Sequence, residues 1–125
     1  MSEKNKNYSY RDLIVWQKSM DLVVLIYNIT ESFPKNEAYG LTSQIRRSAV
    51  SIPSNVAEGK RRGSKDEYRR FLQIAYASGA ELETQLEIVR RVSFGKNLNL
   101  DNIDLMLSDI MKMLNKLIMV VREQF

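Results

Sequence analysis

Residues 44–62 read QIRRSAVSIPSNVAEGKRR, and this segment combines three features that seldom occur together. Its apolar residues follow a helical spacing, a proline lies inside that spacing, and charged residues stand at both ends. The pattern predicts a packed helix with a basic face. Pro53 would remove the hydrogen bond to the carbonyl of Ala49 and crowd the same turn. Because the spacing resumes in phase after Pro53, we expect a kinked helix and not a broken one.

The flanking sequence predicts three more helices. Apolar residues from Arg11 to Pro34 fall on two neighbouring lines, and the helix with the proline should run from Glu37 to Gly59. Ser64 and Glu67 have the spacing of a capping box, which predicts the start of a third helix, and Asp101 should cap a fourth. These elements predict an all-α, antiparallel up-down-up-down four-helix bundle over residues 11–125, preceded by a flexible segment at residues 1–10.

One glycine in the third predicted helix indicates how closely the helices pack. Gly79 lies among Ala77, Ser78 and Ala80. A glycine inside an isolated helix costs about 1 kcal/mol relative to alanine. We therefore expect another helix to approach the chain very closely at Gly79.

The composition narrows the possible functions. The 125 residues include 44% apolar and 27% charged residues, but no cysteine and no histidine. Their absence excludes disulfides, thiol nucleophiles, zinc sites built on Cys or His, and a histidine base that titrates near neutral pH. A small globular domain without enzymatic activity, metal or cofactor is the expectation.

The distribution of apolar residues also bears on location. No apolar run approaches the roughly 18 to 20 residues that cross a bilayer, and residues 1–7 lack the apolar centre of a signal peptide. The segment 59–64 has two glycines before a helix but not the Gly-Lys-Ser order of a nucleotide-binding loop. We expect a cytoplasmic chain with no membrane contact and no evident small-molecule substrate.

The positive charge is concentrated in the middle of the chain. The net charge is +4, and residues 37–70 hold eight basic and four acidic side chains. A local basic cluster can attract phosphate backbones. One interpretation is a basic band that binds nucleic acid; the other is that Arg47 and Arg61 are satisfied by Glu58 and by subunit contacts. The predicted band comprises Arg47, Lys60, Arg61, Arg62, Lys65, Arg69 and Arg70.

Two further sets of residues carry structural predictions. Arg46 and Glu81 lie beside apolar helix faces, so they could form a buried or interfacial ion pair or remain exposed to solvent. The first and last helices carry more apolar residues than a monomeric bundle needs, which predicts a homo-oligomer. Its expected interface consists of Val15, Leu22, Ile26, Met106, Met113 and Ile118.

Several sequence motifs resemble those of one bacterial family. They are Leu13–Trp16, Phe33–Pro34, Tyr39–Leu41, Gln44–Gly59, Arg69–Leu72 and Glu81–Leu86. In order and content they resemble proteins encoded in intervening sequences of bacterial 23S ribosomal RNA genes. The resemblance implies an antiparallel four-helix bundle that assembles into a ring, in known members a pentamer. It also implies a distant similarity to a basic, nucleic-acid-binding accessory protein of diversity-generating retroelements.

Two functions are consistent with these observations. The first is a non-catalytic oligomeric bundle that binds the backbone of RNA or DNA through the basic band. The second is a ring-forming scaffold that binds another protein and has no nucleic-acid role. Trp16 lies at core spacing, so we expect it in the core and not stacked on a base.

Overall fold

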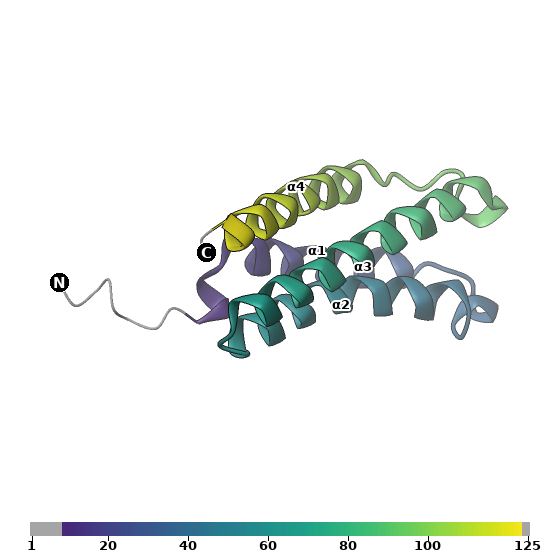
Figure 1. Cartoon of the computed structure of the whole chain (residues 1–125). Coiled ribbons are helices and arrows are strands. Elements are labelled where there is room, and N and C mark those ends of the chain that lie inside the picture. The colour runs from purple at the N-terminus through teal and green to yellow at the C-terminus, as the bar shows by residue number, and fades with distance from the viewer. Residues whose placement is uncertain (1–8, 124–125) are drawn as a thin grey trace.

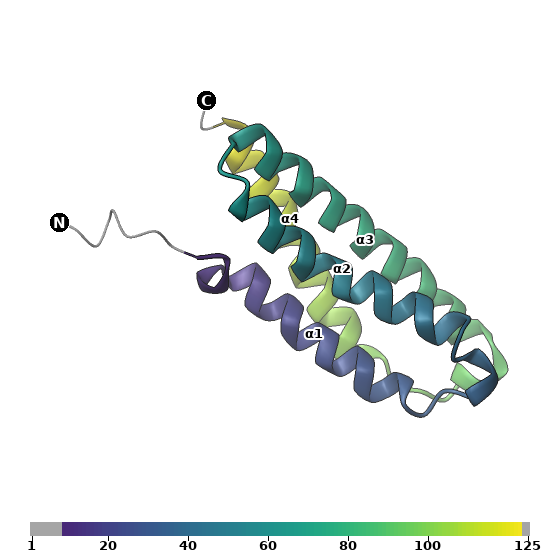
Figure 2. The ribbon, with the colours of Figure 1, turned by 90° about the horizontal axis from the view of Figure 1, so that it is seen from below.

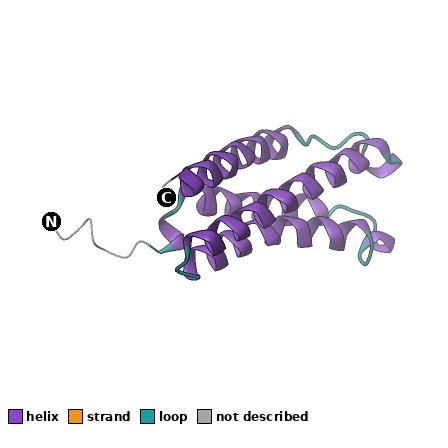
Figure 3. Ribbon diagram, in the orientation of Figure 1, coloured by secondary structure: helices purple, strands orange, loops and turns teal. Residues whose placement is uncertain are grey.

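The structure is a computed structural model that describes residues 9–123, and these residues form four long helices. The helices are α1 (Ile14–Thr30), α2 (Leu41–Arg61), α3 (Lys65–Arg91) and α4 (Asp101–Glu123) (Figures 1 and 3). Three short 3₁₀ turns accompany them, at Tyr10–Asp12, Lys35–Glu37 and Ser93–Gly95. Residues 9–123 contain no strand, so the prediction of an all-α protein with four helices is confirmed. Most of the predicted flexible segment, residues 1–8, lies outside the described residues.

Each helix packs against two others. The contacts join α1 to α2, α2 to α3, α3 to α4, and α4 back to α1. Figure 2 shows the α1–α2 and α3–α4 connections at one end of the molecule and the α2–α3 turn at the opposite end. Among residues 9–123, no helix is long and apolar enough to span a membrane.

The core lies between the four helices and is built from aliphatic side chains. α2 and α3 each contribute one apolar face, as the helical spacing predicted. The largest side chains that are completely or almost completely buried are Leu22, Ile26, Ile45, Ile52, Leu72, Leu82, Leu86, Leu107, Ile110 and Leu114.

The apolar line of α1 that we assigned to the oligomer interface lies in the core. Val15 is 5% exposed and Leu22 and Ile26 are 0% exposed, so all three belong to the core and not to an oligomer interface. The other line faces outward in part, since Met20 and Tyr27 are both exposed. Both lines have helical spacing, and spacing alone does not determine which one faces α2 and α4.

The interface residues predicted on α4 are also packed within the subunit. Met106, Met113 and Ile118 are half-buried against the core. Three other apolar residues of α4 are more exposed: Leu105 at 66%, Met119 at 43% and Val120 at 39%. Because half-buried side chains keep part of their surface accessible, the interface assignment of Met106, Met113 and Ile118 stays a prediction, and the more exposed residues add to the apolar surface of α4.

The glycine that makes the turn after α2 is Gly63 and not, as we predicted, Gly59. Gly59 does not stop the helix, which continues to Arg61. Gly59 is buried because α3 passes so close that an added Cβ would lie 2.7 Å from Cβ of Phe71. Gly63 provides the reversal, with φ of +80°, a conformation that glycine adopts without steric cost.

The first residues of the predicted second helix form a separate turn. Glu37 ends the 3₁₀ turn, and α2 begins four residues later at Leu41. The Glu37 carboxylate accepts a hydrogen bond from the Leu41 amide at 3.2 Å, so it caps α2 from outside. α2 is continuous through Pro53, which is buried, and the prediction that the helix does not break is confirmed.

The close approach predicted at Gly79 is confirmed. A Cβ added there would overlap Sδ of Met111, which comes from α4 and is itself 8% exposed. The missing side chain of Gly79 therefore makes room for a methionine of the neighbouring helix. Ser78, next to it, forms a hydrogen bond with Ser51 of α2 at 2.7 Å.

Candidate nucleic-acid interface

Six basic side chains gather where α2 turns into α3. They come from the last residues of α2, the turn, and the first residues of α3: Lys60, Arg61, Arg62, Lys65, Arg69 and Arg70. We call this set the turn cluster. Glu58, Asp66 and Glu67 lie in the same segment, so residues 58–70 carry a net charge of +3. The positive φ of Gly63 creates the cluster, because it brings the ends of the two helices together.

Two arginines of the turn cluster are held by carboxylates. Arg62 donates to Glu58 at 2.8 Å and lies 3.8 Å from Glu67. Arg70 donates to both Glu67 oxygens, at 3.2 and 3.1 Å. This hydrogen bond lowers the pKa of Glu67 below its usual value and raises the pKa of Arg70. All these pairs are solvent-exposed, so they add little stability and a phosphate can compete for the arginines.

The same cations also lie on aromatic rings. The Lys60 ammonium lies 5.5 Å from the centroid of Tyr68, and the Arg62 and Arg70 guanidinium groups lie 4.8 and 4.7 Å from the centroid of Phe71. Arg61 lies 5.5 Å from the ring of Tyr10. These contacts orient the long side chains without neutralising their charge. Lys60, Arg61 and Arg69 form no ion pair with another residue of the described chain.

Arg47 is separated from the turn cluster. It lies fourteen residues before Arg61 on the same helix, which corresponds to about 21 Å along the axis at ~1.5 Å per residue. The structure therefore brings six of the seven predicted residues together and places Arg47 near the other end of α2. The predicted band is not continuous.

Arg46 and Glu81 do not form an ion pair within the subunit. Nε of Arg46 donates to Oγ1 of Thr30 at 2.8 Å, and its guanidinium lies 4.4 Å from the ring centroid of Tyr27. Arg46 therefore points toward α1, whereas Glu81 is exposed on α3. The alternative of exposed side chains is correct for Glu81, while Arg46 is half-buried against Tyr27 and Thr30.

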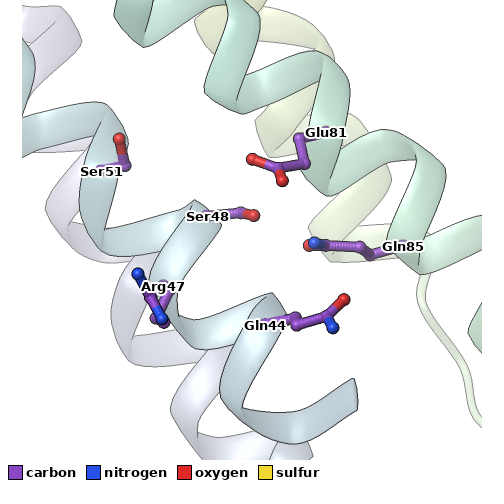
Figure 4. A pocket seen from close by; sticks show the side chains of 6 residues that line it. All are labelled: Gln44, Arg47, Ser48, Ser51, Glu81 and Gln85. Atoms are coloured by element: carbon purple, nitrogen blue, oxygen red, sulfur yellow. The ribbon is translucent and has the colours of Figure 1, made fainter. Parts of the chain in front are cut away.

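Glu81 lines a polar pocket between α2 and α3. Figure 4 shows Gln44 and Ser48 pointing from α2 toward α3, and Glu81 and Gln85 pointing back toward α2. The pocket has a volume of about 340 Å³. Oε1 of Gln85 is buried and has no hydrogen-bond partner among the described residues. The pocket is polar on both walls, so it could hold a small polar group more readily than an apolar one.

Two of the sequence motifs supply the walls of this pocket. Gln44, Ser48 and Ser51 belong to the motif 44–59, and Glu81 and Gln85 belong to the motif 81–86. Both motifs carry the family resemblance, and among the residues that line the pocket only Arg47 and Glu81 have a predicted role. Polar residues beside an apolar helix face can line an interhelical pocket, but the pairing of α2 with α3 had to be known first.

The comparison with known families agrees with this arrangement of motifs. A family model described as 23S rRNA-intervening sequence protein matches residues 11–116. The chain belongs to this family. The resemblance inferred from the sequence motifs is thereby confirmed, and the motifs of the 23S rRNA-intervening sequence protein that lie in this range include both walls of the polar pocket.

A solved structure gives the same fold. The similar chain is a protein of unknown function from the S23 ribosomal protein family of Bacteroides thetaiotaomicron, with 29% sequence identity and a TM-score of 0.75. The alignment covers 84% of the present chain and 98% of that chain. No curated protein matches the chain.

Proposed function

We propose that this member of the 23S rRNA-intervening sequence protein family is a non-catalytic, oligomeric four-helix bundle that binds the backbone of nucleic acid through the turn cluster. The observation that carries the proposal is the net charge of +3 on residues 58–70, three quarters of the charge of the whole chain. Lys60, Arg61 and Arg69 have no carboxylate partner in the described chain, and they supply the charge for phosphate contacts.

The test is a binding measurement across salt. We expect the Lys60→Gln, Arg61→Gln, Arg69→Gln triple variant to bind a fluorescent 20-nucleotide RNA far more weakly than the unmodified protein at 50 mM salt. Each lost phosphate contact lowers the slope of log K against log salt by about 0.7 to 0.9, so the three changes should lower it by roughly 2 to 3. Fluorescence anisotropy measures both quantities.

A variant of opposite effect serves as the control. Glu67→Gln removes the carboxylate that holds Arg70 and lies near Arg62, so it should tighten RNA binding several-fold and steepen the salt slope. Equal affinities for the triple variant, Glu67→Gln and the unmodified protein would refute the turn cluster as the binding surface. No RNA or DNA binding at low salt would refute the proposed function.

We propose further that the protein is a homo-oligomer, with five subunits as the family resemblance implies. Exposed apolar side chains on two adjacent helices support this: Ile14 and Val24 on α1 are 61% and 57% exposed, and Leu105 on α4 is 66% exposed. Between α1 and α4 lies a mostly apolar groove of about 470 Å³, lined in part by Ile14, Met113 and Val120. A closed ring buries such a surface by repeating one contact.

The oligomer prediction is tested by sedimentation velocity at micromolar concentration. A mass near five times the chain mass of 14.5 kDa is expected. A mass near 14.5 kDa would refute the oligomer, and a dimer would support a buried apolar surface but reject five subunits. If the protein forms a ring but binds no nucleic acid at low salt, the alternative function, a ring-forming scaffold for another protein, is favoured over nucleic-acid binding.

The direction of the helices and the bend of α2 belong to the same proposal. We propose that α1 to α4 run up-down-up-down and that Pro53 kinks α2, since proline has no N–H to bond to the carbonyl of Ala49. In the Pro53→Ala variant, we expect a crystal structure to show a straighter α2. An unchanged angle between residues 41–52 and 54–61 would mean that packing, and not the proline, sets the course of the helix.

A further inference from the structure

A second pocket lies near the start of α2, where no function has been assigned. It is formed by α1, the α1–α2 connection and the first three turns of α2, and its volume is about 550 Å³. The aromatic, hydroxyl and cationic side chains that could contact a ligand in this pocket are Tyr27, Tyr39, Thr42, Arg46 and Arg47. This volume is within the range of small-molecule sites. Its lining contains two arginines and no carboxylate.

The two arginines have donors to spare. Arg46 uses Nε to bind Thr30, and the ring of Tyr27 supports its guanidinium at 4.4 Å, but its two Nη groups make no hydrogen bond within the described chain. Arg47 forms no ion pair or hydrogen bond with any described residue. In contrast, Arg62 and Arg70 of the turn cluster are both engaged by carboxylates. Guanidinium groups without a carboxylate partner are suited to bind a phosphate.

The aromatic and polar residues of the pocket point to more than a phosphate. Tyr39 is 100% exposed, which is unusual for an aromatic side chain of this size. Thr42 is only 7% exposed, and its buried Oγ1 has no hydrogen-bond partner among the described residues. A free aromatic face can stack a base, and an unpartnered hydroxyl can bind a polar group of a ligand.

We propose that this pocket binds a nucleotide, with its phosphate on Arg46 and Arg47 and its base stacked on Tyr39. The nucleotide can be one unit of a single strand or a free mononucleotide, since the chemistry is the same. For a strand, the inference rests on the proposed function. In this proposal, Thr30 and Tyr27 of α1 hold Arg46 in position to bind the phosphate. Tyr39 stacks on the base, a role that the helical spacing of the sequence did not indicate.

The position of the pocket suits a strand that also contacts the turn cluster. Arg47 and Arg61 are fourteen residues apart on α2, close to four helical turns, so they lie on nearly the same face of the helix. The separation of about 21 Å equals roughly six stacked nucleotides at ~3.4 Å each. A single strand of more than about six nucleotides can therefore reach both sites along α2.

The test compares single-stranded with double-stranded RNA. We expect Tyr39→Ala and Arg47→Gln each to weaken binding of a fluorescein-labelled 12-nucleotide poly(A) RNA by about 10-fold, in line with the loss of one base stack or one charge-assisted contact. Tyr39→Ala should leave binding of a 12-base-pair RNA duplex unchanged, because paired bases cannot stack on Tyr39. The triple variant of the turn cluster should weaken the binding of both RNAs.

Matched controls come from exposed residues of the same types elsewhere. Tyr76→Ala removes another exposed tyrosine, on α3, and Arg91→Gln removes an exposed arginine that pairs with Glu87. Neither should affect poly(A) binding. Unchanged poly(A) affinity in Tyr39→Ala, or an equal loss for the duplex, would overturn the pocket as a site for a nucleotide of a strand.

A titration with adenosine monophosphate separates this inference from the proposed function. In NMR spectra, the mononucleotide should shift the ring signals of Tyr39 and Tyr27, whereas inorganic phosphate should leave the Tyr39 ring unchanged. If the unmodified protein binds no RNA at low salt, the proposed function fails, and the titration alone decides the pocket. Shifted Tyr39 signals then support a free-nucleotide site, and unshifted signals overturn the inference.

Discussion

Replacing Gly95 with alanine should lower the free energy of unfolding by about 3 kcal/mol or more, a large effect for one methyl group. An added Cβ would overlap the carbonyl oxygen of Val89 and lie 2.6 Å from Cγ1 of Val89. The obstacle is largely backbone near the end of α3, and Val89 is 0% exposed, so it cannot move aside without disturbing the core. Urea-induced unfolding, followed by circular dichroism, measures the change.

Gly63→Ala is the matched control for this prediction. Gly63 has φ of +80° and no atom within 4 Å of an added Cβ, so alanine would cost only the strain of a left-handed backbone, roughly 1 to 2 kcal/mol. If Gly95→Ala destabilises the protein no more than Gly63→Ala does, the close approach of Val89 to Gly95 would be contradicted.

The second large effect is expected from Leu22. Leu22→Ala should lower the free energy of unfolding by about 2 to 5 kcal/mol, because Leu22 is 0% exposed and its truncation leaves a cavity in the core. Ile14→Ala, on the same helix at a position that is 61% exposed, should change the stability of the subunit by less than about 0.5 kcal/mol. Thermal and urea-induced unfolding of the two variants provide the comparison.

The same pair of variants tests the reassignment of the apolar surface. In the proposed oligomer, Ile14→Ala should weaken assembly while the subunit stays folded, and sedimentation measures this directly. If Leu22→Ala leaves the stability unchanged but abolishes assembly, Leu22 would belong to the interface after all, and the packing of α1 would have to be revised.

Sequence spacing was sufficient for the elements but not for their faces. The helical period identified four helices, and Ser64 accepts a hydrogen bond from the Glu67 amide at 3.1 Å as its capping position predicted. The reciprocal half of that capping box is absent, since the Glu67 carboxylate binds Arg70. On α1, two apolar lines have equally good spacing, and only the positions of α2 and α4 determine that Leu22 is buried while Met20 is exposed.

The candidate site was predictable where it is local in sequence and not where it depends on packing. Residues 60–70 lie together because they surround one turn, so the turn cluster could be inferred from charge alone. The positions of Arg46 and Glu81 could not, because Arg46 reaches sideways to Thr30 on α1 instead of across to α3. The second pocket also required the structure, since Tyr39 lies in a connection whose course the helical period does not describe.

The contact between Gly79 and Met111 fixes the register of α4 on α3. The absence of a side chain on Gly79 leaves a gap in the surface of α3, and the Met111 side chain of α4 fills this gap. If α4 slid by one helical turn, about 5.4 Å, Met111 would meet Ala75 or Leu82, whose buried side chains already fill the corresponding positions. The two helices therefore cannot change register while they stay packed, and any shift requires them to separate first.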